Sequence, residues 1–245
     1  MELTPIEKYG NIWIKRDDLF TFNGLKGAKV RNALFLIKDA INKGFKHITS
    51  VGHRDSPQLY IVGKLCEHFG LHFVGHTTMG VLPDHLNGFE IIQHKPGYNN
   101  VIQARCVKFA KENNYYLIPF GMENFVCSKQ LIYQVSNLKN VPAKRIVITV
   151  GGGINLCGLV WGLQKYEINI PIIGIVIGKN PEKLMNTFAP KNWKAKVQLV
   201  DANQAYNKHI EQTLYGIKLD PVYEAKCFDF IEDGDLFWII GVRTF

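Results

Sequence analysis

The chain has 245 residues, of which 47% are hydrophobic and 20% are charged. This composition is typical of a globular protein and argues against a disordered, collagenous or membrane-spanning chain. The 29 lysines and arginines outnumber the 21 acidic residues, which gives a formal charge of +8. Because these cations are spread along the whole chain, the charge permits an anionic substrate or a nucleic-acid partner and proves neither.

The cysteines and the first residues bear on where the protein works. The cysteines are Cys66, Cys106, Cys127, Cys157 and Cys227. They show no CxxC pair and no metal-ligand spacing, so we expect reduced thiols and no metal site. The segment MELTPIEKYG has neither a basic start nor an apolar stretch, which argues against a signal peptide or an anchor. We therefore expect a cytoplasmic protein without a membrane partner.

Two helices are predicted early in the chain. The segment 29–43 has apolar residues at helical spacing and is followed by Gly44, a common helix stop. A second helix is predicted over 57–69, with Ser56 as its N-cap and Pro57 as its first residue. The residues that we expect these helices to bury are Val30, Ala33, Leu34, Ile37, Ala40, Ile41, Leu59, Val62 and Cys66.

Strand-like runs of apolar and β-branched residues recur between the helical patterns. These runs span residues 47–51, 71–75, 115–119, 145–150, 172–178 and 237–242. Further helices are expected around 100–113, 128–138 and 155–166, whereas 179–190 has the composition of a turn-rich connection. Buried strands that alternate with helices indicate an α/β fold with a parallel sheet.

The most informative motif is TVGGGINLCG at 149–158, which follows a predicted strand and opens a predicted helix. Consecutive glycines let backbone N–H groups turn toward an anion, and the helix N-terminus adds partial positive charge. The motif lacks the GK[ST] of a P-loop and the GxGxxG of a dinucleotide-binding turn. It is therefore a candidate phosphate cradle, with a tight turn that binds no ligand as the alternative.

Three other positions carry candidate chemistry. Lys29 begins an amphipathic helix, where the local positive field favours the neutral amine needed for imine formation; a solvated lysine is the alternative. Ser56 either caps its helix or presents its hydroxyl to a ligand. Tyr223 beside Glu224 is suited to acid–base work, although an Asp-Pro turn before a helix explains the same residues.

Five segments, taken in order, resemble the tryptophan-synthase-β-like, or fold type II, pyridoxal-phosphate enzymes. They are KRDDL at 15–19, GAKVR at 27–31, the turn with Ser56, GGGINLCG at 151–158 and LDPVYEAK at 219–226. The resemblance is greatest to the branch of 1-aminocyclopropane-1-carboxylate deaminase and D-cysteine desulfhydrase. The chain is shorter than typical members, which implies trimmed loops or elements around the substrate entrance.

The resemblance implies a two-lobed α/β fold with mostly parallel sheets. We expect a small lobe over 46–125 and a large lobe formed by 1–45 and 126–245, with the cofactor between them. Ligands of open α/β sheets bind at strand carboxyl ends and helix N-termini. The resemblance also implies a small amino-acid substrate and a homodimer.

The implied cofactor is pyridoxal 5'-phosphate. Lys29 falls on the lysine that forms the internal aldimine and then moves protons at the substrate α-carbon. The phosphate site falls on Gly151, Gly152, Gly153, Ile154 and Asn155. Thr244 matches the hydroxyl residue that bonds the pyridine nitrogen in this fold type, where a neutral partner restrains the electron sink.

The remaining implied roles concern the substrate. Ser56 falls on a serine that faces the substrate carboxylate and reacting carbons, and Tyr223 with Glu224 falls on a tyrosine–acid pair that lines the substrate pocket. Tyr223 is our candidate general acid or base. In the family an asparagine that contacts the cofactor ring hydroxyl follows the serine. Here Pro57 cannot donate, so Gln58 or another residue substitutes, or the ring sits differently.

We therefore expect a pyridoxal-phosphate-dependent lyase or deaminase that removes an α-proton from an amino acid through Lys29, followed by deamination, elimination or replacement. One alternative substrate is an amino acid attached to a nucleobase, as in viral DNA hypermodification. The charge of +8, the trimmed entrance and the four Trp and ten Tyr residues motivate it. Another alternative is a degenerate, non-catalytic fold that still binds the cofactor.

Overall fold

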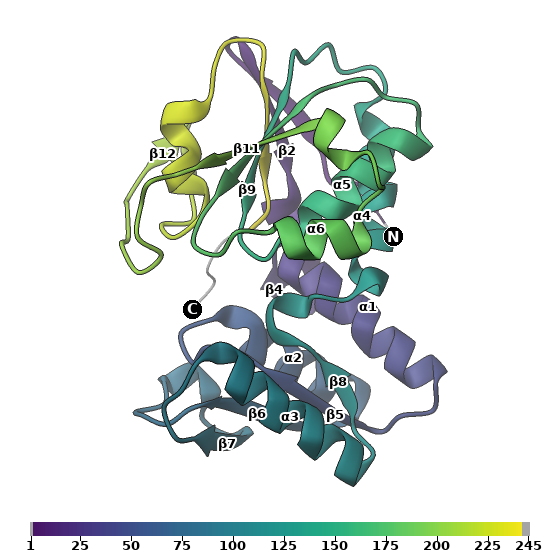
Figure 1. Ribbon diagram of the computed structural model, residues 1–245, viewed down its shortest axis with the longest axis vertical. Coiled ribbons are helices and arrows are strands. Elements are labelled where there is room, and N and C mark those ends of the chain that lie inside the picture. The colour runs from purple at the N-terminus through teal and green to yellow at the C-terminus, as the bar shows by residue number, and fades with distance from the viewer. Residues whose placement is uncertain (1, 242–245) are drawn as a thin grey trace. The chain divides into compact units, whose positions relative to one another are not determined.

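The computed structural model describes residues 2–241, which form two compact units (Figure 1). Each unit carries its own sheet with helices packed on it, and the pairing within both sheets is mostly parallel. The expected α/β class with mostly parallel sheets is therefore confirmed. Unit 1 comprises residues 2–20, 26–28 and 127–241, and unit 2 comprises residues 21–25 and 29–126.

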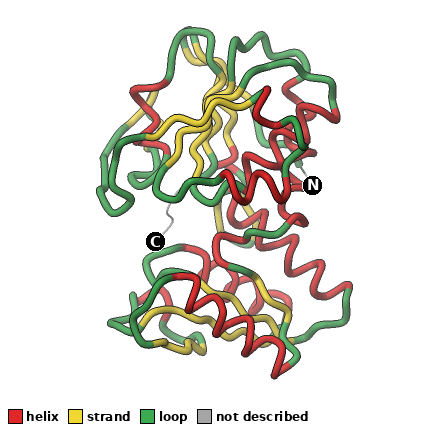
Figure 2. Tube along the Cα trace, viewed as in Figure 1, coloured by secondary structure: helices red, strands yellow, loops and turns green. Residues whose placement is uncertain are grey.

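Unit 1 is built on a six-stranded sheet in the order β1-β2-β14-β9-β10-β11 (Figure 2). Its strands are β1 (Ile6–Tyr9), β2 (Ile12–Arg16), β9 (Ile146–Val150), β10 (Ile172–Val176), β11 (Val197–Asp201) and β14 (Leu236–Ile239). Only β1 runs antiparallel to its neighbour. The loops that follow the parallel strands therefore gather at one edge of the sheet, which is where open α/β sheets bind ligands.

Helices and a small hairpin complete unit 1. They are most of α4 (Phe125–Gln134), α5 (Ile154–Lys165), α6 (Glu182–Phe188) and the hairpin of β12 (Thr213–Leu214) and β13 (Ile217–Lys218). The core on one side of the sheet joins Ile14, Val147, Ile175 and Phe237, which are almost completely buried. These residues come from four neighbouring strands, so their burial fixes the sheet from which the functional loops project.

Unit 2 is built on a four-stranded parallel sheet in the order β7-β6-β5-β8. Its strands are β5 (His47–Val51), β6 (His72–Thr78), β7 (Glu90–His94) and β8 (Tyr116–Ile118), and its helices are α1 (Ala28–Asn42), α2 (Pro57–Phe69) and α3 (Asn99–Asn113). The Tyr116 hydroxyl donates to the Asp39 carboxylate at 2.7 Å and so ties α1 to β8. Residues 29–45, which we expected in the large lobe, are accordingly grouped with unit 2.

Short segments lie between these elements. They are the hairpin of β3 (Thr21–Phe22) and β4 (Leu25–Lys26) and the 3₁₀ turns η1 (Asp17–Leu19), η2 (Asp84–Leu86), η3 (Phe120–Met122), η4 (Val135–Leu138), η5 (Trp193–Ala195) and η6 (Glu224–Phe230). No helix within residues 2–241 combines the length and the apolar composition that crossing a membrane requires.

The helix predictions are confirmed most closely at α2, whose bounds, N-cap and first-turn proline are those expected. The predicted buried face of α1 is wrong at Ile41, which is 40% exposed, whereas Leu36 is fully buried. Ile41 lies in the last turn, at the flank of the buried stripe. The segment 179–190 is not only a connection, because it contains α6, which buries Leu184 and Met185.

Candidate functional site

The glycine loop of residues 151–153 joins the fully buried strand β9 to α5. Gly153 is the N-cap of α5 and has φ +102°, a left-handed conformation that L side chains rarely adopt. A Cβ at this position would lie 2.9 Å from Cβ of Pro181. Ile154 points into the core and is buried, so this turn offers a ligand its backbone N–H groups rather than hydroxyls.

Tyr223 lies beside the glycine loop within unit 1. A Cβ added to Gly151 would be 3.1 Å from a ring carbon of Tyr223 and 3.3 Å from its hydroxyl oxygen. The Asp220 carboxylate accepts the N–H groups of Val222 and Tyr223 at 2.8 and 3.0 Å, which fixes the turn before η6. The Asp-Pro turn thus positions Tyr223. The turn and the tyrosine–acid pair, which the sequence left as alternatives, are parts of one arrangement.

Tyr206 is a residue of this edge that sequence reasoning missed. It follows β11, is 46% exposed, and its ring meets that of Tyr223 edge to face at 5.9 Å between centroids. The two hydroxyl oxygens are 3.5 Å apart. The buried Lys226 donates to the carbonyls of Ala205 and Tyr206, at 2.7 and 3.2 Å, and holds the loop in place. The only sequence signal was a tyrosine shortly after a strand.

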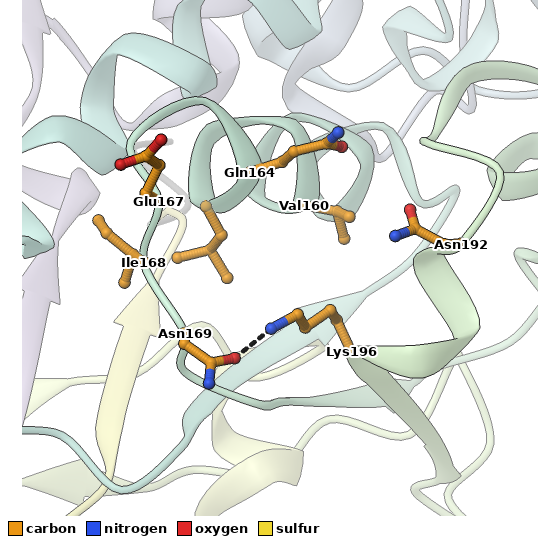
Figure 3. Close-up of a pocket in the computed structure, with 8 residues that line it drawn as sticks. Val160, Gln164, Glu167, Ile168, Asn169, Asn192 and Lys196 are labelled. Carbon is orange, nitrogen blue, oxygen red and sulfur yellow. Dashed lines mark hydrogen bonds between the residues drawn. The ribbon is translucent and has the colours of Figure 1, made fainter.

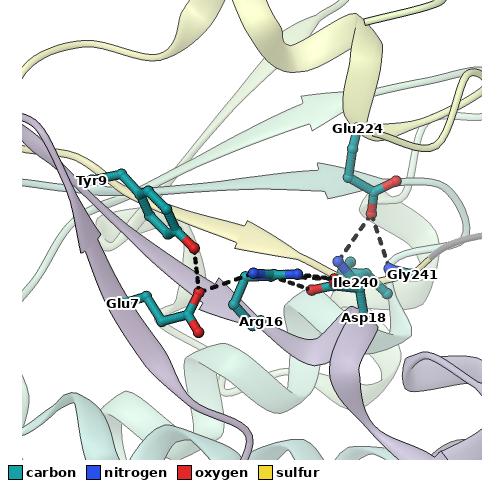
Figure 4. Close-up of polar contacts among 7 residues, drawn as sticks. All are labelled: Glu7, Tyr9, Arg16, Asp18, Glu224, Ile240 and Gly241. Carbon is teal, nitrogen blue, oxygen red and sulfur yellow. Dashed lines mark hydrogen bonds and ion pairs between the residues drawn. The ribbon is translucent and has the colours of Figure 1, made fainter. Parts of the chain in front are cut away.

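Glu224 is 2% exposed, and one of its carboxyl oxygens accepts the N–H groups of Ile240 and Gly241 at 3.0 and 3.3 Å (Figure 4). Burial, together with the nearby Asp220, raises the pKa of Glu224 to about 8, so the carboxyl is mostly protonated at pH 7. The carbonyl of Ile240 accepts the N–H of Ala28, the residue before Lys29. Glu224 thus fixes the end of β14, while Thr244 lies outside the described residues.

The KRDDL segment has its charges engaged inside unit 1. Lys15 is fully buried, and its amine donates to the Thr4 carbonyl at 2.7 Å and to the Asn137 side chain at 2.9 Å. Arg16 pairs with Asp18 at 2.8 Å and with Glu7 at 2.9 Å, and these partners raise the pKa of Arg16 (Figure 4). These contacts join the first strands to the rest of unit 1 and give the motif a structural role.

Ser56, Pro57 and Gln58 form the turn from β5 to α2 in unit 2. The Ser56 hydroxyl accepts the N–H of Gln58 at 3.4 Å, which is the expected cap. The side-chain amide nitrogen of Gln58 is buried and donates to Ser50, Val51 and Pro119 at 2.8–3.1 Å. An amide nitrogen has two N–H groups, so Gln58 has no donor left to replace the family asparagine.

The structure brings together the predicted site residues of unit 1, whereas the two in unit 2 lie at the starts of separate helices. Within unit 1, the glycine loop, Tyr223 and Glu224 lie at the carboxyl edge of the sheet, joined by Tyr206. Within unit 2, Ser56 caps α2 after β5, and Lys29 is a partly exposed residue in the first turn of α1. The cradle beside Tyr223, which a Cβ at Gly151 would fill, fits a phosphate held by backbone N–H groups.

Comparison with known proteins shows which sequences and folds this chain resembles. No family model matches the chain. A protein of Thermotoga maritima assigned as a 1-aminocyclopropane-1-carboxylate deaminase is 26% identical over 91% of this chain and 83% of its own. A protein of Pyrococcus furiosus with the same assignment is 27% identical over 95% of this chain and 86% of its own length. The D-cysteine desulfhydrase of Yersinia pestis is 25% identical over 94% and 85%.

Solved structures give the same fold. A crystal structure of an ACC deaminase homologue superposes with a TM-score of 0.84 at 24% identity, over 98% of this chain and 90% of that one. The structure of threonine deaminase isoform 2 of Solanum lycopersicum gives a TM-score of 0.68 at 13% identity, over 96% of this chain and 76% of that one. The sequence alignments extend over 269 and 283 positions, more than the 245 residues of this chain, so they contain gaps within it. The chain thus resembles the 1-aminocyclopropane-1-carboxylate deaminase and D-cysteine desulfhydrase branch of the fold type II pyridoxal-phosphate enzymes in a shortened form, and it is a pyridoxal-phosphate-dependent enzyme of this deaminase and lyase type.

Proposed function

We propose that this enzyme removes the α-proton of a small amino acid and then releases ammonia or another leaving group. The names of its relatives, deaminase and desulfhydrase, supply the reaction class. The observation that carries the proposal is the position of Tyr223, whose hydroxyl lies beside the glycine loop at the carboxyl edge of a parallel sheet. A phosphate cradle next to a group that can transfer protons is what this chemistry needs.

The roles of the holding residues follow from their chemistry. When bound, pyridoxal phosphate supplies an electron sink that makes the substrate α-proton acidic. The backbone N–H groups of residues 151–155 and the N-terminus of α5 would hold its phosphate, since charge-assisted backbone hydrogen bonds suit an anion. Lys29 would hold the cofactor through its amine and would move the proton at the substrate α-carbon.

Hydroxyl groups would carry out the remaining proton transfers. Tyr223 is the proposed general acid or base, and Tyr206, 3.5 Å away between hydroxyl oxygens, would pass or orient its proton. The Ser56 oxygen accepts from the backbone, so its own O–H can still donate to the substrate carboxylate. Glu224, neutral at pH 7, would keep the end of β14 in place without adding a negative charge to the site.

The proposal is tested by spectroscopy and turnover together. The purified chain with pyridoxal phosphate should show the visible absorption of a lysine-linked cofactor, and it should exchange the α-proton of an amino acid with solvent deuterium. Lys29→Ala should abolish both. Lys26→Ala, at an exposed lysine nearby, should abolish neither. If the wild-type chain shows no such band with the cofactor supplied, the proposal is wrong.

The substrate is identified by its products. We expect release of ammonia and a 2-oxo acid from a member of a panel that includes D-cysteine and other small amino acids with a hydrogen on the α-carbon. 1-Aminocyclopropane-1-carboxylate has no such hydrogen, so ammonia release from it would contradict the α-proton step. Sulfide release would mark a desulfhydrase. Exchange of the α-proton without net product on the whole panel would contradict the deamination or elimination step while leaving the cofactor assignment intact.

The nucleobase-linked substrate has no support in the comparisons and stays a prediction, as does the homodimer. The charge of +8 is shared by the whole chain and does not single out a surface. Salt-sensitive binding to DNA would favour the nucleobase substrate, because phosphate contacts release counterions and weaken as salt rises. An absence of DNA binding at low salt would exclude it.

A further inference from the structure

A partly enclosed pocket of about 290 Å³ lies in unit 1 at the end of α5 opposite the glycine loop (Figure 3). It is formed by the last turns of α5, the connection to β10 and the segment around η5. Its lining residues are Val160, Leu163, Gln164, Glu167, Ile168, Asn169, Asn192 and Lys196. The glycine loop is roughly 15 Å away along the helix axis, at 1.5 Å of rise per residue, so the pocket is a separate site.

The lining has an apolar part and a polar part. Val160, Leu163 and Ile168 are less than 10% exposed and form an apolar wall. The Asn192 amide is directed into the pocket and Lys196 extends along its other side, whereas the Glu167 carboxylate is directed away (Figure 3). A ligand in this pocket would therefore meet N–H donors from Asn192 and Lys196 as well as the hydrocarbon of the apolar wall.

Lys196 supplies positive charge that its contact with Asn169 does not neutralise. Its amine donates to the side-chain oxygen of Asn169, which is an amide and not a carboxylate. By contrast, Lys194 of the same segment pairs with Glu182 at 3.2 Å. Within residues 2–241, no ion pair of Lys196 is found. The backbone of Lys196 is fixed, because its carbonyl accepts the N–H of Ile172 at 2.8 Å.

The volume limits the size of the ligand. A dry apolar cavity of about 150 Å³ holds one benzene ring, so 290 Å³ admits a molecule of roughly five to eight heavy atoms with space for water around its polar end. A nucleotide is too large. An uncharged hydrocarbon would pack on the apolar wall but would gain no hydrogen bond from Lys196 or Asn192, which limits its affinity.

We propose that this pocket is a second binding site, for a small carboxylate with a short aliphatic chain. The carboxylate would accept hydrogen bonds from Lys196 and Asn192, and the chain would pack on Val160, Leu163 and Ile168. The site needs no cofactor, and it does not depend on the proposed function.

The test is calorimetric titration of the cofactor-free chain with three matched probes. 4-Methylpentanoate should bind, and 4-methylpentan-1-ol should bind about tenfold more weakly or worse, because a charge-assisted hydrogen bond is lost. Leucine, which adds an ammonium group, should also bind more weakly, since the Glu167 carboxylate is directed away. Equal binding of the alcohol would overturn the assignment to a carboxylate, and equal binding of leucine would overturn the preference for a ligand without an ammonium group.

Variants locate the binding. Lys196→Met should weaken 4-methylpentanoate binding about tenfold, whereas Lys194→Met, at the exposed lysine two positions earlier, should bind as the wild type does. Asn192→Ala, at an exposed position, provides a second change that leaves the fold intact and should weaken binding severalfold. Unchanged affinity in both Lys196→Met and Asn192→Ala would overturn the proposal, as would equal loss in Lys194→Met.

Discussion

The two strand-to-helix turns, one in each unit, use the same position in a parallel sheet in opposite ways. The turn from β9 to α5 has glycines, a left-handed Gly153 and no side-chain cap. The turn from β5 to α2 has Ser56 as a cap, a proline in the first turn, and a Gln58 amide that is engaged by three acceptors.

We propose from this difference that the glycine loop is the turn that binds an anion. Where the side chains satisfy the helix start, as around Ser56, the backbone has little left for a ligand. Where glycines remove the side chains, as in the glycine loop, the N–H groups and the helix dipole are left to bind one. In this proposal the turn from β5 to α2 offers a hydroxyl, and the turn from β9 to α5 offers backbone N–H groups. Four substitutions test this division.

The largest expected effect comes from Tyr223→Phe, next to the glycine loop. The substitution keeps the ring against Gly151 and removes the hydroxyl, so turnover should fall about 10²-fold or more while cofactor binding is retained. Steady-state kinetics and a cofactor titration measure the two effects. Tyr206→Phe is the matched control for loss of a neighbouring hydroxyl and should cost less. If Tyr223→Phe turns over at the wild-type rate, Tyr223 has no part in proton transfer.

Gly153→Ala should weaken cofactor binding about tenfold and lower the free energy of unfolding by about 1–2 kcal/mol, because alanine is strained in the left-handed region. Contact with Pro181 adds to the cost. Gly97→Ala is the control, since its nearest neighbours are at 3.9 Å and its φ is outside the left-handed region. Urea unfolding and cofactor titration measure both quantities. Equal cofactor affinity in the two variants would show that this turn does not hold the phosphate.

Glu224→Gln should change how stability depends on pH. Because burial raises the pKa of Glu224 to about 8 in the folded chain, its proton is bound in the folded state and lost in the unfolded state between about pH 4.5 and 8. Its contribution to stability is therefore full below about pH 4.5 and falls as pH rises to 8. Relative to the wild type, the glutamine variant should gain stability, on the order of 1–4 kcal/mol, from pH 5 to pH 9. Parallel unfolding curves at all pH values would contradict the raised pKa.

The smallest effect is expected at the turn from β5 to α2, where Ser56 caps the helix. Ser56→Ala should lower the free energy of unfolding by about 1 kcal/mol through loss of the helix cap. Ser56→Asn should restore stability, since asparagine also caps, and should leave turnover low if the hydroxyl serves the substrate. Denaturant unfolding and kinetics on both variants separate the two roles. Full turnover in Ser56→Asn would leave Ser56 with capping alone.

Local signals explain what the sequence could predict. The bounds of α2 follow from Ser56 and Pro57, and the glycine loop follows from its own composition and its place after a strand. The place of Tyr206 could not be predicted, because it depends on β11 lying in the same parallel sheet as β9. The use of the Gln58 amide depends on Pro119, far along the chain. The helix α6 was missed since turn-forming residues surround it.

The central claim is that Lys29 carries the cofactor, and one measurement tests it directly. The wild-type chain is incubated with pyridoxal phosphate and borohydride, which fixes the cofactor to its lysine, and the modified peptide is identified by mass spectrometry. We predict modification at Lys29 in stoichiometric amount, and none at Lys26 or Lys38. Modification spread over several surface lysines, or its persistence at the same level in Lys29→Ala, would contradict the account.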